Sequence, residues 1–92
     1  MTSAEIIDCN ILPPGSVLMV ETRNRQYQIE CLGGSAIRIS GHPEYCPTPV
    51  PGELRSDGVI ERGHHLRFLL QDRRPVTTTR VMRLRVQRPS IQ

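Results

Sequence analysis

The 92-residue chain contains no lysine and no tryptophan, and only three aromatic residues, Tyr27, Tyr45 and Phe68. All twelve basic residues are therefore arginines, whose planar guanidinium groups make bidentate contacts with carboxylate or phosphate. With so few aromatic residues, the core has to be built from Val, Ile, Leu and Met. A chain of this size buries only about 60–65% of its unfolded surface, and this small core favours self-association into an oligomer.

The chain also has no apolar run near the ~18 residues of a membrane span. Its beginning shows neither the basic nor the apolar region of a secretion signal. Three cysteines are an odd number, which argues against a full disulfide framework. We therefore expect one domain, 1–92, in a reduced cytoplasmic protein without a membrane partner.

Charge is unevenly distributed along the chain. Residues 1–61 hold four arginines against eight acidic residues, whereas residues 62–92 hold eight arginines against Asp72 alone. Such asymmetry is typical of an anion-binding face. The explanation that we favour is an acidic half that folds against a basic half and neutralises it.

The first segment carries a helix signal. Thr2 and Glu5 have the spacing of a capping box before Ile6 and Ile7, which predicts a short helix over 3–9. The prolines and glycine of "LPPG" that follow would end this helix.

Residues 16–40 alternate apolar and polar side chains with period two, which is typical of half-buried strands. Turns are expected around Asn24 and at Gly33-Gly34. The segment therefore predicts a three-strand meander. In the first strand Leu18, Val20 and Thr22 share one face, and Val17, Met19, Glu21 and Arg23 share the other. In the next two strands the inward side chains would be Tyr27, Ile29, Cys31, Ile37 and Ile39.

Residues 41–57 hold four of the eight prolines and are predicted to form a long loop. Prolines at 47, 49 and 51 favour an extended path outside sheet pairing. Long loops often carry function, so this loop is a candidate protein-interaction surface. Its candidate contact residues are Tyr45, Pro47, Pro49 and Pro51.

Residues 58–88 predict the C-terminal strands. Leu66, Phe68 and Leu70 alternate in the first of them. In "VMRLRVQR", 81–88, the alternation predicts that Met82, Leu84 and Val86 point inward and that Arg83 and Arg85 point outward. Five or six short strands of this kind close into a small barrel, which removes exposed sheet edges.

This order of elements resembles the Sm-like family of SH3-type small barrels over about residues 3–87. "IERGHHL", 60–66, is similar to the arginine-glycine segment of that family's second motif. The turn "CLGGSA", 31–36, lacks the Asp and Asn with which the family holds a base, so the resemblance implies a barrel but no RNA contacts. The chain also resembles small uncharacterised bacterial proteins that share "VETRN…Y" (20–24, 27) and a "TT" before a final strand, and this likeness brings no function.

The arginines of the last strand suggest a second use for the barrel. Arg83 and Arg85 would stand about 7 Å apart on the outer face, close to the spacing of successive phosphates, and Arg67 would join them if its strand pairs beside them. These three residues predict non-specific binding of RNA or single-stranded DNA. Alternatively, the arginines pair with acidic residues across the strands, each pair contributing about 0.2–1 kcal/mol.

A metal or thiol site has weaker support. His42 and Cys46 are separated by three residues, and His64 or His65, with Cys31, could complete a zinc set. Cys46 beside His42 or His65 could form a thiolate–imidazole pair. Zinc sites usually show two close-spaced ligand pairs, whereas here Pro43 and Pro47 interrupt the loop, and the adjacent His64 and His65 would point opposite ways in a strand. So small a barrel also has no interior room for a substrate, so we expect no cofactor.

The sequence therefore predicts a mostly-β, five- to six-stranded SH3- or Sm-like barrel with a short N-terminal helix and a long proline-rich loop. Its predicted role is that of a non-enzymatic, oligomeric protein-interaction module. Strands 16–23 and 79–87 are the expected pairing edges. Nucleic-acid binding is the alternative, and a small metal- or thiol-dependent enzyme is the remote one.

Overall fold

The computed structural model describes residues 2–87, and its regular elements in that range are β-strands and one short 3-10 turn. Arg88, the end of the predicted C-terminal strands, lies outside the described residues. The elements are β1 (Thr2–Ala4), β2 (Ile6–Asp8), β3 (Val17–Thr22), β4 (Gln26–Gly33), β5 (Ala36–Ser40), β6 (Val50–Leu54), η1 (Ser56–Gly58), β7 (Val59–Glu61), β8 (His65–Leu70) and β9 (Pro75–Gln87).

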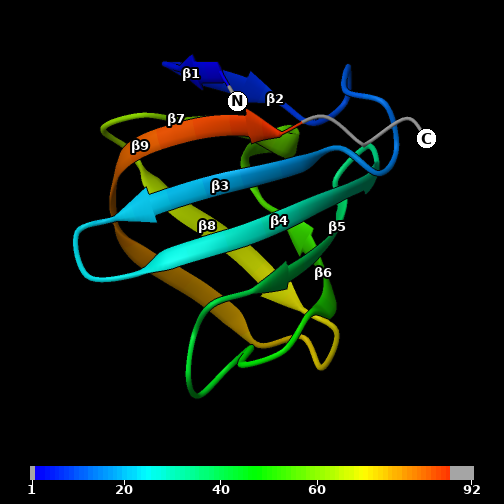
Figure 1. Ribbon diagram of the computed structural model, residues 1–92. Helices are drawn as coiled ribbons and strands as arrows, with labels where there is room; N and C mark the ends of the chain where they lie inside the picture. The colour runs from blue at the N-terminus through cyan, green and yellow to red at the C-terminus, as the bar shows by residue number, and fades with distance from the viewer. Residues whose placement is uncertain (1, 88–92) are drawn as a thin grey trace.

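Six of these strands form a closed antiparallel barrel (Figure 1). Along the chain, β3 pairs with β4, β4 with β5, β5 with β6, β6 with β8 and β8 with β9. The long strand β9 then pairs with β3 and closes the cylinder. The predicted small, mostly-β barrel is confirmed, and β3 to β5 occupy the segment in which three strands were expected.

The barrel interior is filled by side chains that alternate along each strand. Leu18 and Val20 of β3 are fully buried, and so are Ile37 and Ile39 of β5. Tyr27 of β4 meets Phe68 of β8 edge to face, with ring centroids 6.1 Å apart. These two rings are the largest buried side chains among the described residues, and aliphatic side chains fill the space around them.

The predicted helix over 3–9 is wrong. Residues 2–4 form β1 against β9, and residues 6–8 form β2 against β7. Ile7 is buried while its neighbour Ile6 is 55% exposed, which is the alternation of a strand. Glu5 bonds Arg62 at 2.7 Å instead of capping a helix. A helix this short costs more to nucleate than it gains, whereas two strands already present in the fold supply ready hydrogen-bond partners.

The alternation of β9 contains a break that the sequence analysis missed. Val81 pairs with Thr22 and Arg83 pairs with Glu21, so Met82 is an extra residue, a β-bulge. Val81 is buried and Met82 is 56% exposed. The prediction that Met82 points inward is therefore wrong. A bulge places two consecutive residues on the same side of the strand, so the inward–outward alternation shifts by one position beyond it. Leu84 points inward as predicted.

The proline-rich segment is shorter as a loop than predicted, because β6 lies within it. Pro51 belongs to β6 and pairs with Arg38 of β5, whereas the pairing of β6 with β8 begins one residue later, at Gly52. The expectation that Pro51 stays out of the sheet is wrong, since a proline is tolerated at the beginning of a strand. The remaining loop is held in place by Cys46, which is fully buried. The backbone N–H of Cys46 donates to the carbonyl oxygen of His42, and the carbonyl oxygen of Cys46 accepts from the N–H of Gly41.

The predicted pairing edges are also wrong. β3 lies between β4 and β9, and β9 has β1 on the far side from β3. Both strands are therefore inside the sheet, and β1 is its terminal strand. Among residues 2–87, the structure contains no helix of the length and apolar character needed to cross a membrane.

Candidate functional site

Three arginines leave the outer wall of the barrel from adjacent strands. Arg55 follows β6, Arg67 lies in β8 and Arg80 lies in β9, and all three are exposed. Each is next in sequence to a buried core residue: Leu54, Phe68 and Val81, respectively. Because successive side chains of a strand point to opposite faces, the three guanidinium groups are directed outward.

Strand pairing brings these arginines together. The backbone N–H of Arg55 donates to the carbonyl oxygen of Arg67 at 3.0 Å. On the other side of β8, Arg67 pairs with Thr77 and His65 pairs with Arg80 of β9. Figure 1 shows β8 running between β6 and the first half of β9. The three arginines therefore occupy one surface that spans three strands.

The same surface is hollowed at two adjoining places. One hollow, of about 470 Å³, is lined by Arg55, Arg67, Phe68, Pro75, Val76 and Thr77. The other, of about 380 Å³, is lined by Gly63, His64, His65, Arg67 and Arg80. Arg67 lines both, so the two hollows adjoin at this residue. We call this surface, defined by Arg55, His65, Arg67 and Arg80, the arginine groove.

The groove is electropositive because its arginines have no acidic partners. None of Arg55, Arg67 and Arg80 forms an ion pair with a residue in the described part of the chain. Other arginines do: the ion pairs are Arg38–Glu30, Arg62–Glu5, Arg74–Asp72 and Arg83–Glu21. Glu53 is the only acidic residue within the three contributing segments, 50–55, 65–70 and 75–80. The wall of the groove thus carries a net positive charge.

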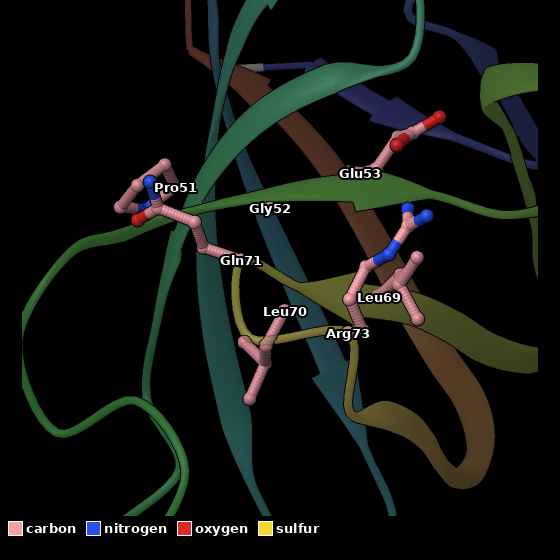
Figure 2. Close-up of a pocket in the computed structure, with 7 residues that line it drawn as sticks. All are labelled: Pro51, Gly52, Glu53, Leu69, Leu70, Gln71 and Arg73. Atoms are coloured by element: carbon pink, nitrogen blue, oxygen red, sulfur yellow. The ribbon is translucent and has the colours of Figure 1, made fainter.

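Glu53 lies beside a further hollow of about 250 Å³ at the end of the same face. Its other lining residues include Gly52, Leu69 and Arg73. Figure 2 shows the Arg73 side chain extending from the turn after β8 toward the side of β6 that carries Glu53. A fourth arginine, Arg73, therefore lies near the Glu53 carboxylate, and positive charge stays in excess on this face.

Two histidines complete one end of the groove. The Nδ1 atom of His65 lies 2.7 Å from the carbonyl oxygen of Thr78, so Nδ1–H donates to it and Nε2 remains available to a ligand. His64 is turned toward Glu61, with Nε2 and Oε2 2.6 Å apart. The loop that carries both is fixed against β9 by hydrogen bonds between Gly63 and Val81 and between Val81 and His64, each 2.8 Å long.

The structure separates the arginines that the sequence analysis grouped. Arg67 pairs with Thr77, whereas Arg83 and Arg85 lie further along β9 opposite Glu21 and Met19 of β3. Nε of Arg83 is 3.6 Å from a carboxylate oxygen of Glu21, as the alternative of cross-strand pairing anticipated. Arg85 is partly buried, and its Nε atom has no hydrogen-bond partner among the described residues.

Arg55 and Arg80 were not among the site residues predicted from the sequence. Arg55 fell within the segment predicted to be a loop, although it directly follows Leu54, the last residue of β6. Arg80 precedes Val81, the residue that begins the bulge. The available signal was local: each of these arginines adjoins an aliphatic residue that the barrel needs in its core.

The metal candidates are not brought together into a site within the described part of the chain. Among residues 2–87, no three His, Cys, Asp or Glu side chains are placed to hold a metal ion. Burial raises the pKa of the Cys46 thiol, which disfavours the thiolate. Nδ1 of His42 accepts hydrogen bonds from the backbone N–H groups of Glu44 and Tyr45, so it is engaged in holding the loop.

The predicted interaction loop has one side chain that is firmly held. The ring of Tyr45 packs against the ring of His42, with centroids 4.5 Å apart, and the guanidinium of Arg74 lies 5.5 Å from the Tyr45 ring centre. Tyr45 is 37% exposed, and Pro47, Pro49 and Pro51 are exposed as well. The structure places these residues on the surface, and Tyr45 and Pro51 line a common hollow there.

Comparisons of the chain with protein-family models, curated proteins and solved structures found no match. The fold and the site by themselves define a class: a closed six-stranded antiparallel barrel with a cationic groove on its outer wall.

Proposed function

We propose that this protein is a non-enzymatic binding protein that holds the phosphate backbone of single-stranded nucleic acid in the arginine groove. One observation carries the proposal: Arg55, Arg67 and Arg80 line two adjoining hollows on adjacent strands and lack ion-pair partners among the described residues. A guanidinium group left without a carboxylate partner is available to a phosphate.

The geometry favours an extended polyanion over a single small anion. The row formed by Arg55, Arg67 and Thr77 crosses three strands, and the row formed by His65 and Arg80 lies two residues further along β8. Two residues of a strand span about 7 Å, which approximates the distance between successive phosphates in an extended strand. A ligand with several regularly spaced phosphates can therefore contact both rows.

The groove offers contacts to phosphates but little to bases. Phe68 lines it, yet the ring is fully buried in the barrel. Single-strand binding proteins usually combine a cationic groove with exposed aromatic rings on which bases stack. We therefore expect weak sequence preference, similar affinity for RNA and DNA, and strong dependence on salt.

The test is a binding titration with a fluorescently labelled 20-nucleotide oligo(dT) at several salt concentrations. The variant R55A/R67A/R80A removes the groove arginines, and R38A/R74A/R83A removes three arginines that are ion-paired elsewhere, so both variants have the same net charge. The groove variant should bind at least about tenfold more weakly, with a salt slope lower by about 2. The control variant should retain most of the affinity.

Two outcomes would contradict the proposal. If both triple variants lose affinity equally, net charge and not the groove accounts for binding. If the wild-type protein does not bind the oligonucleotide at low salt, the groove has another ligand. Oligo(rU) in place of oligo(dT) tests whether the two nucleic acids are bound alike.

Self-association and protein contacts through the loop stay predictions from the sequence. Light scattering at several protein concentrations tests the first. Capture experiments with the wild-type protein and with a variant in which the exposed residues Tyr45, Pro47 and Pro49 are replaced by alanine test the second, and identical partners in both experiments would remove the loop from consideration.

A further inference from the structure

Two cysteines lie in contact where the N-terminal segment joins the barrel. Cys9 follows β2, and Cys31 belongs to β4. Their Sγ atoms are 3.0 Å apart, both side chains are fully buried, and the two residues are 22 positions apart in the sequence. The third cysteine, Cys46, is buried in the loop before β6. The chain thus holds one close thiol pair and one separate thiol.

The backbone on both sides of this pair is fixed. The N–H of Cys9 donates to the carbonyl of Gly58 at 2.9 Å. The N–H of Cys31 donates to Ser16, and its carbonyl accepts from Gly15, both at 2.8 Å. The thiols therefore face each other as a consequence of the fold.

The contact also makes the two sulfurs chemically unequal. Their hydrogen bond lowers the pKa of Cys31, and burial opposes this effect. The same hydrogen bond, together with burial, raises the pKa of Cys9. When the pair ionises, Cys31 is therefore the sulfur that loses its proton. A thiolate beside a second thiol is the arrangement required for thiol–disulfide exchange.

We propose that Cys9 and Cys31 are a reversible disulfide site, oxidised by a low-molecular-weight disulfide such as oxidised glutathione. The Cys31 thiolate attacks one sulfur of the oxidant and releases one thiolate, leaving a mixed disulfide. The thiolate released in this first step takes the proton of the Cys9 thiol. The Cys9 thiolate then attacks the Cys31 sulfur and releases the second thiolate, which is protonated by water. Two protein thiols become one protein disulfide, and the oxidant is reduced to two thiols. This inference is independent of the arginine groove.

The short strands of the N-terminal segment give the oxidant access. Neither sulfur has exposed surface in the folded chain, so exchange begins when this segment moves away. The segment is held by three residue pairs each in β1–β9 and β2–β7 and by the Glu5–Arg62 ion pair. Local opening of such short elements costs less than global unfolding. The disulfide formed by oxidation then links Cys9, and with it the N-terminal segment, covalently to Cys31 of the barrel.

The positions of the arginines make the experiment direct. Trypsin separates the three cysteines into the peptides 1–23, 26–38 and 39–55. Reduced protein is incubated with oxidised glutathione in native buffer, free thiols are alkylated, and the digest is analysed by mass spectrometry. We expect peptide 1–23 linked to peptide 26–38, Cys46 alkylated, and release of the link by dithiothreitol. Closing this loop should raise the Tm by about 10 °C.

The same oxidation carried out in urea, and two cysteine variants, test whether the cysteines pair at random. In urea the 31–46 link should become prominent, because the shortest loop closes most readily. Cys46→Ala should retain the native link, and Cys9→Ala should lose it without forming a 31–46 link in native buffer. Three alkylated cysteines in wild-type protein, a stable mixed disulfide, or a 31–46 link in native buffer would each overturn the proposal. The wild-type digest decides the matter even if a variant fails to fold.

Discussion

Arg55 and Arg67 are hydrogen-bonded neighbours across β6 and β8, with the N–H of Arg55 donating to the carbonyl of Arg67 at 3.0 Å. Their guanidinium groups leave the same face of the sheet from adjacent positions. Like charges directly opposite each other destabilise a sheet, so folding alone does not favour this pair. A negatively charged ligand removes the repulsion, and this agrees with a binding role for the groove.

This repulsion leads to a first prediction, in which stability and binding change in opposite directions. Arg67→Glu places a carboxylate beside Arg55 and should leave the free energy of unfolding unchanged or raise it by about 0.2–1 kcal/mol. The same variant should lose oligonucleotide binding. Urea denaturation at low salt measures the first effect.

Arg38→Glu is the control for this prediction, because it places a second carboxylate opposite Glu30 and should lower stability. A clear loss of stability in Arg67→Glu would mean that Arg67 has a structural role.

The bulge in β9 gives a second prediction, since simple alternation treats Met82 and Leu84 alike. Met82 is 56% exposed and Leu84 is buried. Met82→Ala should change stability by no more than about 0.5 kcal/mol, whereas Leu84→Ala should cost about 2–5 kcal/mol. Chemical denaturation of both variants provides the measurement. Equal costs would place Met82 inside the barrel and remove the bulge.

Gly41, at the end of β5, gives a third prediction. Its backbone has φ +125°, and a Cβ atom there would lie 2.4 Å from the carbonyl oxygen of Gln26. Gly63 also has a positive φ, but no atom lies within 4 Å of the corresponding position. Gly41→Ala should therefore destabilise the protein more than Gly63→Ala does, by about 1–3 kcal/mol. Equal costs in thermal denaturation would mean that backbone conformation, without the clash, accounts for both.

The loop histidine gives a fourth prediction, which concerns pH. Burial, and then the nearby Arg25, lower the pKa of His42 below its ordinary value of 6.5, with a smaller opposing effect from Glu44. Neutral Nδ1 accepts the N–H groups of Glu44 and Tyr45. As the pH falls below about 6.5, the unfolded chain binds a proton before the folded chain does, so this contribution to stability is lost.

The variant His42→Asn isolates that effect, because the Asn side-chain oxygen can accept the same N–H groups but does not titrate. Above about pH 7, the two proteins should differ by a constant amount. On acidification the wild-type urea midpoint should fall faster than that of the variant. Parallel pH profiles would show that His42 has the same pKa in the folded and unfolded chains.

Much of the barrel could be predicted from the sequence, because the direction of a strand side chain is a local property. Ile37 and Ile39 were predicted to point inward and are buried, and Leu18 and Val20, predicted to share one face, are buried together. The outward direction of Arg67 followed from the same rule. No pairing partner had to be known for these predictions.

Pairing partners decided the rest. Residues 2–8 became strands because β9 and β7 offered hydrogen bonds, and Met82 turned outward because β9 bulges opposite β3. The register of β6 against β8 placed Arg55 beside Arg67, and the return of the N-terminal segment placed Cys9 against Cys31. The sequence alone determined which side chains of a strand face the core, because this follows from the periodicity along that strand. The tertiary structure determined which distant residues meet, because the register of each strand depends on all the strands around the closed barrel.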